Sequence, residues 1–456
     1  MAKETAREAS TTKGHVRALA TSVRGLDTVF CCGGSVELQQ PVQLRLASGS
    51  VIAVERETWG RDRLVKRLER LCKPAPFGVG NETRHDPRVR AGGQLLAAHA
   101  FNVDGIDLKD SGIMRSIRDA LCPDDAAMPE AELYALNVYG ARGHFLRHKD
   151  TPRDPDVFGT LVACLPVEFS GGRLVLRHET TRSYDWGHGG YSLPSAPYRV
   201  AWAAFYGDVD HEVEPVRMGT RVTLTWLLRR GAARGARPRL ATATETDLEA
   251  TLTAALADPR FMPRGGTLAV PCVHLYADTP GLVKPSAKLS RDALLRLKGR
   301  DRLVASAALR AGIVLRYRPY LHETCAGESW RLSRGPTPGE VAIFDRAQLG
   351  ASMLERLPIE HHARWMERGN DDDVSWIAPP PWQRAKGADH AEPAENLLGE
   401  LEYSSTDYFG NEGSDAAFYL SAALLATVPP ATERKRTRGQ GATAQTRRKR
   451  RAAVTG

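Results

Sequence analysis

GTRVTLTWLLRR (219–230) ends a run of short apolar segments that begins with ELYALNVYG (132–140). The segments are rich in Val, Leu, Tyr, Phe and Thr, and Gly, Pro and Asp bound them, which is typical of β-strands joined by turns. Between these two lie HFLRHKD (144–150), VFGTLVACLPVEF (157–169), GRLVLRH (172–178), YRVAWAAFYG (198–207) and HEVEPV (211–216). Seven or more strands without long helices between them predict an antiparallel barrel or a double-sheet roll.

The rest of the chain mixes helical and strand patterns around this β-rich core. Apolar residues repeat at helical spacing over 64–71 and 113–121, and AAFYLSAALLATV (416–428) predicts a last strand, whereas CCGG (31–34) indicates a turn. We therefore expect an α+β protein with a mainly β core, flanking helices and a second, mixed α/β domain. The expected parts are a partly disordered N-terminal extension (1–44), a β-rich domain (45–230), a linker (231–247), a C-terminal mixed domain (248–430) and a disordered basic tail (431–456).

Composition narrows the class of protein. The chain has 456 residues, of which 42% are hydrophobic and 26% charged, a balance typical of a globular protein of about two domains. The longest apolar run, 416–428, is too short to cross a bilayer, and the N-terminus lacks the apolar core of a secretory signal. We therefore expect no membrane insertion and no export. Seven scattered cysteines without CxxC spacing indicate a reducing compartment.

Basic charge is concentrated at the C-terminal end. Nine Lys and Arg residues against Glu433 give the last 26 residues +8 of the net charge of +9, which leaves +1 for everything before them. A basic surface for nucleic acid is therefore expected only on the tail, over residues 434–451. RKRTR (434–438) and RRKRR (447–451) have the form of a bipartite nuclear-localisation signal, and the alternative is a solvated extension that binds any polyanion. We expect a cytoplasmic or nuclear protein.

The residues most informative about chemistry are His148 and Asp150, in HFLRHKD. Residues i and i+2 of a strand project to the same side, so the imidazole and the carboxylate are expected to point together into the roll. His211 begins a later segment and supplies a third donor. Two histidines and one carboxylate form the facial triad of non-heme Fe(II) oxygenases, which leaves the other coordination positions open.

An HxD tripeptide alone is more often a surface His–Asp pair, so the prediction depends on the residues that accompany it. Arg221 follows His211 by ten residues and offers a planar, permanently charged group suited to a carboxylate. Thr223 shares the face of Arg221, and Tyr139 precedes the HxD segment. The ordered set of these residues on consecutive predicted strands is much more specific than any one of them.

Other polar residues nearby are assigned to structure or solvent. His178 and His188 could line the pocket, but isolated histidines are usually structural or solvated. Asp208 and Asp210 flank His211 and could compete as ligands, although Asp210, adjacent in sequence, is expected on the opposite strand face.

Three segments, YGARGHFLRHKDTPR (139–153), FSGGRLVLRH (169–178) and FYGDVDHEVEPVRMGTRVTLTWLL (205–228), resemble one known family. They are similar to the Fe(II)- and 2-oxoglutarate-dependent dioxygenases, in their prolyl-4-hydroxylase-like branch, over roughly residues 45–230. The resemblance implies a double-stranded β-helix, the cupin-like jelly roll, and it implies Fe(2+), 2-oxoglutarate and O2 as cofactors, with ascorbate as an optional reductant. Residue by residue, it implies His148, Asp150 and His211 as iron ligands, Arg221 as the catalytic partner of the distal carboxylate of 2-oxoglutarate, and Tyr139 and Thr223 as secondary contacts.

The resemblance implies hydroxylation of a C–H bond in a protein or peptide, with release of succinate and CO2. Prolyl hydroxylases often have Lys at the anion position, whereas Arg221 is typical of other branches, so proline as the substrate does not follow. The same chemistry on a small molecule or nucleobase, and a non-catalytic jelly-roll interaction module, stay open as alternatives. The C-terminal half shows no second HxD triplet. We expect it to shape the substrate cleft, to dimerise or to bind a partner.

Overall fold

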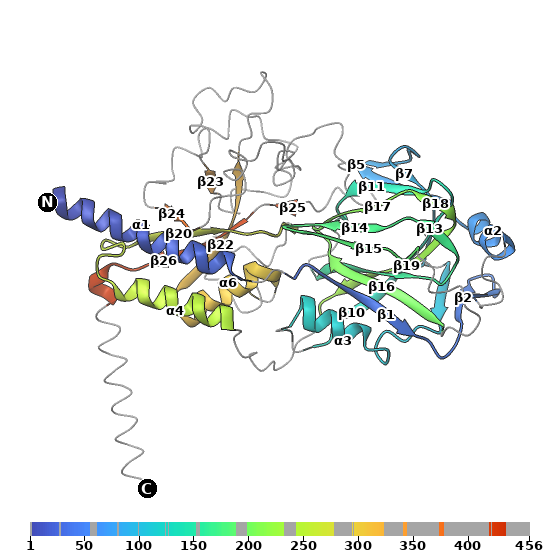
Figure 1. The fold of residues 1–456 in the computed structure, drawn as a ribbon, viewed down its shortest axis with the longest axis horizontal. Helices are drawn as coiled ribbons and strands as arrows, with labels where there is room; N and C mark the ends of the chain where they lie inside the picture. Colours follow the sequence, from blue (N-terminus) through green and yellow to red (C-terminus); the bar gives the residue numbers. More distant parts are fainter. Residues whose placement is uncertain are drawn as a thin grey trace, which may run out of the picture.

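The computed structural model shows an elongated molecule in which a β-rich body and a smaller helix-and-sheet half lie end to end (Figure 1). The structure describes residues 2–26, 29–54, 62–79, 82–98, 100–123, 125, 127–151, 156–187, 198–231, 243–277, 294, 296–322, 341–343, 374–377, 419–420 and 422–434. The predicted nuclear signal after Arg434, and His188, lie outside these residues.

Two antiparallel sheets form the β-rich body, which we call the roll. The larger consists, in spatial order, of β1 (Cys31–Glu37), β16 (Arg199–Tyr206), β12 (Val157–Cys164), β19 (Arg221–Arg229), β10 (Glu130–Tyr139), β8 (Gly93–Leu96) and β4 (Lys73–Pro74). The smaller consists of β15 (Thr181–Tyr184), β14 (Leu174–Arg177), β17 (Asp210–Val213), β11 (His144–His148) and β7 (Arg90–Ala91). A mainly β fold with several antiparallel sheets is thus confirmed.

The central strands of the roll are buried on both faces. On β19, Arg221, Thr223 and Thr225 line a pocket between the sheets, while Val222 and Leu224 belong to the hydrophobic core. This is why the segment appears as a nearly continuous apolar run in the sequence, with polar residues only at every second position.

Short sheets and two helices close the roll. The short sheets are β13 (Phe169–Gly171) with β18 (Val216–Gly219), β3 (Val51–Val54) with β2 (Val42–Leu46) and β9 (Phe101–Asp104), and β5 (Phe77–Val79) with β6 (Glu82–Arg84). Helices α2 (Asp62–Leu71) and α3 (Ile113–Leu121) coincide with the two predicted helical patterns. Helix α3 buries its apolar face against β1 and β16, as its spacing predicts.

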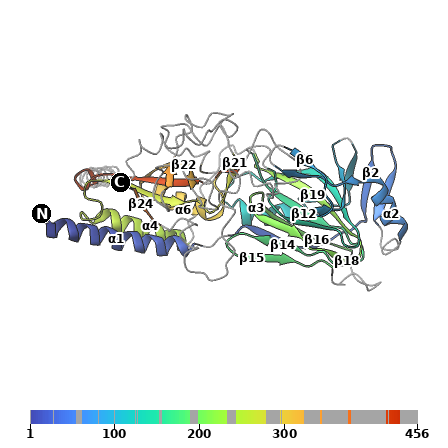
Figure 2. The ribbon, with the colours of Figure 1, turned by 90° about the horizontal axis from the view of Figure 1, so that it is seen from above.

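A separate five-stranded sheet forms the centre of the C-terminal half, by which we mean the described residues of 243–434. Its strands, in order, are β23 (Val341–Ile343), β22 (Val314–His322), β26 (Ala422–Val428), β20 (Gly266–Pro271) and β24 (Val374–Trp376). A separate pair joins β21 (Tyr276–Ala277) to β25 (Tyr419–Leu420). Strands β25 and β26 fall where the last strand was predicted. Helices α4 (Ala243–Ala257) and α6 (Gly299–Arg310) lie with α1 (Ala2–Arg24) on one side of this sheet (Figure 2). Helix α4 begins inside the predicted linker.

Within the predicted N-terminal extension, α1 is a helix that packs on α4. Its last turns bury Leu19 and Val23 in the same hydrophobic cluster as Leu248 and Leu252 of α4. The polar first turns of this segment conceal that apolar stripe in the sequence. None of the described helices is long and apolar enough to cross a membrane.

Strand β1 differs from the prediction, because CCGG is part of a strand and not a turn. Seven residues of β1 pair with β16, so the large sheet begins before residue 45. A Cβ on Gly33 would lie 2.5 Å from the Tyr184 ring and 2.7 Å from the Trp202 carbonyl oxygen. The glycine therefore permits close packing of a strand that has no β-like apolar alternation.

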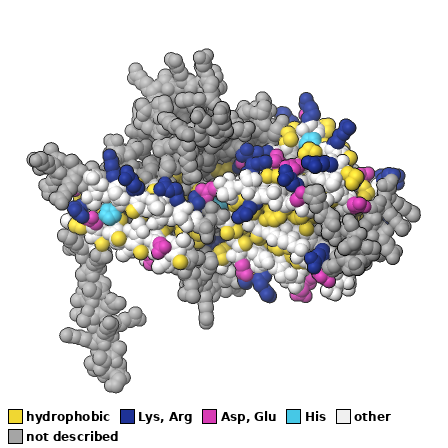
Figure 3. Space-filling model, in the orientation of Figure 1, with side chains coloured by type: hydrophobic (Ala, Val, Ile, Leu, Met, Phe, Trp, Pro, Cys, Tyr) yellow, Lys and Arg dark blue, Asp and Glu magenta, His cyan; other side chains and the backbone are white. Residues whose placement is uncertain are grey.

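Arg434, the first basic residue of the predicted tail, contacts the C-terminal half. The Arg434 guanidinium donates to the carbonyl oxygens of Leu256, Phe261 and Met262, which ties this residue to the C-terminal half. Charged side chains of both signs are interspersed on the face of the molecule drawn in Figure 3.

Candidate metal centre and anion pocket

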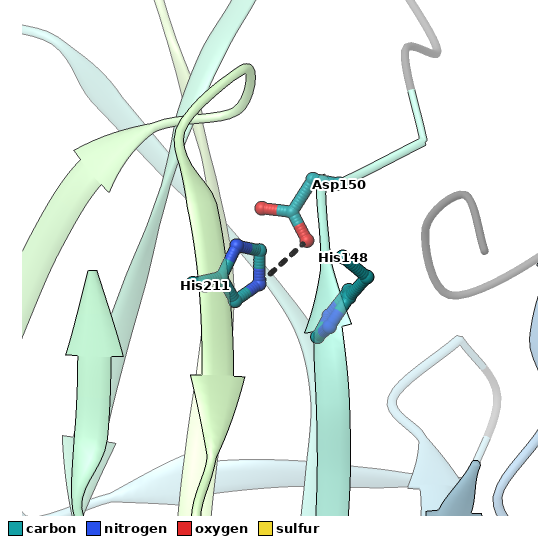
Figure 4. A group of neighbouring side chains, drawn as sticks. All are labelled: His148, Asp150 and His211. Carbon is teal, nitrogen blue, oxygen red and sulfur yellow. Dashed lines mark ion pairs between the residues drawn. The ribbon is translucent and has the colours of Figure 1, made fainter. Parts of the chain in front are cut away.

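Three side chains converge where β11 and β17 lie side by side (Figure 4). His148, at the end of β11, stands opposite His211 on β17, and Asp150 follows β11 directly. One ligand atom from each residue lies within 4.8 Å of the other two, and all three residues are buried. The Nε2 atom of His211 is 3.6 Å from Oδ1 of Asp150. The structure thus brings together three residues that sequence reasoning selected from separate strands.

Backbone carbonyl groups fix both imidazole rings. Nδ1 of His148 donates to the carbonyl oxygen of Leu146 at 2.7 Å, and Nδ1 of His211 donates to that of Val209 at 2.9 Å. Because a carbonyl oxygen only accepts, each Nδ1 carries a proton, which leaves Nε2 as the ring nitrogen available to a metal. A metal-binding histidine has this second hydrogen bond as a rule, since the bond sets the tautomer and the orientation of the ring.

The carboxylate of Asp150 is oriented in the same way. The hydroxyl of Thr160 donates to Oδ2, and the backbone N–H of Asp150 donates to the carbonyl oxygen of Gly207 at 3.0 Å. Oδ1 therefore faces His211. One carboxylate oxygen is bound by the protein and the other is directed toward the imidazoles.

Burial keeps His148 in the protonation state that binds a cation. Burial, and then the neighbouring His211, lower the pKa of His148 well below its ordinary value, so the ring is neutral at neutral pH. The ring of Phe145 stacks on His148 with centroids 3.5 Å apart, and Phe205 lies against His211 at 4.7 Å. These aromatic rings restrict the imidazoles to one position.

Arg221 lies in the same pocket as the three donors. Its side chain is only 1% exposed, and among the described residues Nε and Nη2 have no hydrogen-bond partner. The guanidinium carbon lies 5.3 Å from the Trp186 ring and 5.8 Å from the Tyr139 ring. Burial lowers the pKa of Arg221. A buried guanidinium with two unsatisfied donors is a site for an anion that the polypeptide does not supply.

Tyr139 and Thr223 lie on the wall of the pocket. Strands β10 and β19 pair so that Tyr139 is directly opposite Arg221, and Thr223 stands two residues further along β19. Both residues line the pocket together with Arg221 and the three donors. All six predicted site residues therefore lie around a single pocket.

A polar network in this pocket was not predicted. Oδ1 of Asn137 accepts hydrogen bonds from Arg90 at 2.9 Å and from Gln94 at 3.0 Å, and the Asn137 amide donates to the Thr225 hydroxyl at 3.1 Å. Period-two spacing could have identified Asn137 and Thr225, which stand two residues from Tyr139 and Thr223 on their strands. Arg90 and Gln94 come from the very short β7 and β8, which carry no strand signal in the sequence.

The remaining candidates lie elsewhere. Asp210 points away from the pocket, as expected, and pairs with Arg147 at 2.7 Å and with Lys149. His178 does not line the pocket. It belongs with Asp208 and His274 to a second cluster, whose ligand atoms also lie within 4.8 Å of one another. Among the described residues, these are the two groups with such spacing.

The donor set of the first cluster fits ferrous iron. Two imidazoles and one carboxylate on the same side of a cation leave its opposite face open, and Arg221 stands in the same pocket. This arrangement can hold Fe(II) together with a small anion that contacts both the metal and the guanidinium.

Several solved structures are similar to this chain over part of its length. An oxidoreductase of the 2OG-Fe(II) oxygenase family from Burkholderia pseudomallei is 16% identical, with 39% of this chain and 83% of that chain covered and a TM-score of 0.24. A prolyl-4-hydroxylase from Pseudomonas putida is 18% identical, with 47% and 100% covered and a TM-score of 0.27. A prolyl hydroxylase from Trichoplax adhaerens, in complex with a hypoxia inducible factor peptide fragment, is 17% identical, with 48% and 91% covered and a TM-score of 0.24.

No family model and no curated protein matches the chain. At these TM-scores the structural likeness carries no argument of its own. The chemistry of the site therefore has to be argued from its own residues.

Proposed function

We propose that this protein is an Fe(II)- and 2-oxoglutarate-dependent dioxygenase that hydroxylates a C–H bond of a protein or peptide. The observation that carries the proposal is the juxtaposition, in one buried pocket, of the His148–Asp150–His211 donors with the unsatisfied guanidinium of Arg221. A metal centre alone would be consistent with many reactions. The adjacent anion site favours a cosubstrate that carries a carboxylate at a distance from its metal-binding end.

The metal-binding residues are held ready by their surroundings. His148 and His211 would bind Fe(II) through Nε2, because their Nδ1 atoms are engaged with backbone carbonyl groups. Asp150 would bind through Oδ1, because Thr160 holds the other oxygen. Little reorganisation is needed when the cation enters, which favours tight binding.

Arg221 would hold the distal carboxylate of 2-oxoglutarate. Nε and Nη2 are buried donors to which no described residue bonds, and a carboxylate offers two acceptors with matching geometry. Tyr139 and Thr223 offer hydroxyl groups at the same end of the pocket. These contacts would neutralise the buried charge on Arg221 and fix the orientation of the cosubstrate.

With iron and 2-oxoglutarate bound, the centre would supply an oxidant that inserts one oxygen atom of O2 into a C–H bond, and the other atom ends in succinate. The overall reaction, R–H plus 2-oxoglutarate plus O2 to R–OH plus succinate plus CO2, is balanced without another reductant. The part of the protein is to bind, to orient and to exclude water. Phe145, Phe205, Leu174 and Val213 provide the apolar walls for this task.

The substrate class rests on the resemblance of the sequence segments to the prolyl-hydroxylase-like branch. Arg221 in place of the lysine common in prolyl hydroxylases leaves the oxidised residue unassigned. Mass spectrometry for a +16 Da product across peptide, metabolite and nucleic-acid pools would identify the class. A product found only among metabolites or nucleobases would replace the peptide proposal and keep the chemistry.

Turnover of 2-oxoglutarate tests the proposal directly. Purified protein with Fe(II), ascorbate, O2 and 2-oxoglutarate is expected to form succinate, and candidate extracts should accelerate the reaction. The His148→Ala variant should form none above background. Equal succinate formation by that variant, or none by the wild type in the presence of bound Fe(II), would refute the proposal and favour a non-catalytic interaction module.

A further inference from the structure

A buried carboxylate, both of whose oxygens accept hydrogen bonds, joins the roll to the C-terminal half. The side chain of Asp208, which lies between β16 and β17, is 1% exposed. Its Oδ1 accepts from Nζ of Lys298 at 2.8 Å, and its Oδ2 accepts from Nδ1 of His274 at 3.0 Å and from the backbone N–H of Leu275 at 2.9 Å. All three donors belong to the C-terminal half.

The donors are themselves fixed by a second carboxylate. Asp301 accepts from the backbone N–H groups of Val273 and His274, at 2.8 and 3.1 Å, and from the Tyr276 hydroxyl at 2.8 Å. The Tyr276 hydroxyl in turn accepts from the backbone N–H of Lys298 at 3.0 Å. The C-terminal half therefore presents a rigid set of donors to Asp208.

The loop that carries Asp208 also holds the ligands of the candidate metal centre. The carbonyl oxygen of Gly207 accepts from the Asp150 N–H at 3.0 Å, and that of Val209 accepts from His211 Nδ1 at 2.9 Å. Asp208 stands between these two carbonyl groups. A displacement of its side chain would therefore move the hydrogen-bond partners of two of the three ligands.

Tyr206, at the start of the loop, provides a second tie. Its hydroxyl donates to the carbonyl oxygen of Leu121 at 2.6 Å and accepts from the backbone N–H of Gly299 at 3.2 Å. The segment 206–211 is thus bound to the C-terminal half on one side and to the metal-binding residues on the other.

The same residues could be taken for a second metal site, since Nε2 of His178 and Nε2 of His274 are buried and have no partner within the part of the chain that the structure describes. The position of Lys298 argues against this assignment. Its ammonium group already neutralises Asp208 and would repel a cation placed among these side chains. The ion pair accounts for the carboxylate without a metal.

We infer that the Asp208–Lys298 ion pair is the device by which the C-terminal half positions the 206–211 loop, which makes Asp208 a positioning residue for the metal centre. The inference rests on the proposed function only in assigning iron to the first cluster. It gives the C-terminal half, which showed no triad of its own in the sequence, a defined role in the chemistry.

Anaerobic titration with Co(II), as a stand-in for Fe(II), tests the inference without turnover. The Asp208→Asn variant should bind Co(II) about 10- to 100-fold more weakly, the range typical for loss of a group that orients metal ligands. The KM for 2-oxoglutarate should change little, because Arg221 lies outside the loop. Wild-type protein should bind one Co(II) per chain.

A second variant covers the case in which Asp208→Asn does not fold. The double variant Asp208→Asn/Lys298→Met removes both charges, so no unpaired ammonium stays buried. The ion pair between the loop and the C-terminal half is still lost. This variant should fold and still bind Co(II) more weakly than the wild type. Glu179→Gln is the matched control, because it breaks the ion pair of Glu179 with Arg300, another contact between the halves that does not touch the loop. Its Co(II) affinity should equal that of the wild type.

Three results would overturn the inference. They are wild-type affinity in a folded variant at Asp208, an equal loss in Glu179→Gln, and a second Co(II) ion that disappears in His274→Ala. Failure of the proposed function is distinguishable from all three, because it would appear as wild-type protein that binds Co(II) but forms no succinate with Fe(II).

Discussion

Two clusters in the described chain each bring two imidazoles and one carboxylate within the same spacing, and they differ in what surrounds them. In the cluster of His148, Asp150 and His211, backbone carbonyl groups occupy the Nδ1 atoms and the Nε2 atoms face the centre. In the other cluster, Asp208 uses both carboxylate oxygens to accept hydrogen bonds from Lys298, His274 and Leu275.

The difference shows that residue type and spacing do not by themselves define a metal site. The pKa of Asp208 is lowered well below its usual range, since the attraction of Lys298 and His274 outweighs the opposing effect of burial. That ion pair makes the second cluster a structural joint. The first cluster has preoriented lone pairs and an anion pocket beside it, and these features suit it to catalysis.

The largest expected contrast between the clusters concerns metal binding. His148→Ala should abolish Co(II) binding and succinate formation, because it removes a ligand from a three-ligand centre. His178→Ala, in the second cluster, should leave Co(II) stoichiometry unchanged. Isothermal titration calorimetry on the two variants checks this, and equal losses in both would show that the clusters are not distinct in function.

The second expected contrast concerns binding of 2-oxoglutarate, because only the first cluster has the anion pocket of Arg221 beside it. Arg221→Met should raise the KM for 2-oxoglutarate by about 10- to 100-fold, since a hydrogen bond to a charged group contributes ~1.5–3 kcal/mol. Co(II) affinity should stay close to that of the wild type. Steady-state succinate assays measure the effect, and an unchanged KM would mean that Arg221 does not hold the carboxylate.

The third prediction concerns how strongly metal affinity depends on the orientation of the Asp150 carboxylate, which the Thr160 hydroxyl contacts. Thr160→Val keeps the shape of the side chain and removes the donor to Asp150. We expect Co(II) affinity to fall by about 10-fold, the lower end for loss of a group that orients a metal ligand. Thr225→Val is a suitable control, because Thr225 lines the same pocket and contacts Asn137 instead.

The smallest expected effect is a pH dependence of stability in the second cluster. Burial, and then the neighbouring His274, lower the pKa of His178 from 6.5 to about 3. The unfolded chain therefore takes up this proton below about pH 6.5, whereas the folded protein does not. Stability is fully present above pH 6.5 and declines as the pH falls toward 3.

His178→Phe keeps a ring against His274 and removes the titrating group. On going from pH 6.5 to 4.5, its Tm should fall less than that of the wild type, by on the order of 2–4 °C. Thermal melts followed by circular dichroism at the two pH values measure the difference. An identical decline in both proteins would mean that His178 is accessible to protons when folded.

The parts of the fold that were predictable are those in which local pattern and tertiary burial agree. Strands β10, β12, β16 and β19 carry β-branched and aromatic residues between clear turn signals. With β11 and β17, which carry His148 and His211, they surround the pocket that Tyr139 and Arg221 also line. Helix α3 was predictable because its four buried residues repeat at helical spacing.

The parts that were not predictable depend on partners far away in the chain. Strand β1 has two glycines and little apolar alternation, and its pairing with β16 is what makes it a strand. The short β7 and β8, which supply Arg90 and Gln94, are strands only by virtue of β10 and β11. Asp208 meets His274 across 66 positions of sequence, and no local pattern indicates that contact.

The central claim, that one pocket holds Fe(II) through His148, Asp150 and His211 and 2-oxoglutarate through Arg221, is tested most directly by anaerobic absorption spectroscopy. Addition of 2-oxoglutarate to the Fe(II)-loaded protein should produce the visible charge-transfer band of a ferrous 2-oxo-acid chelate. Arg221→Met should require a higher concentration of 2-oxoglutarate, and His148→Ala should show no band. A wild-type protein that binds Fe(II) without producing the band, or a His148→Ala variant with an undiminished band, would contradict the claim.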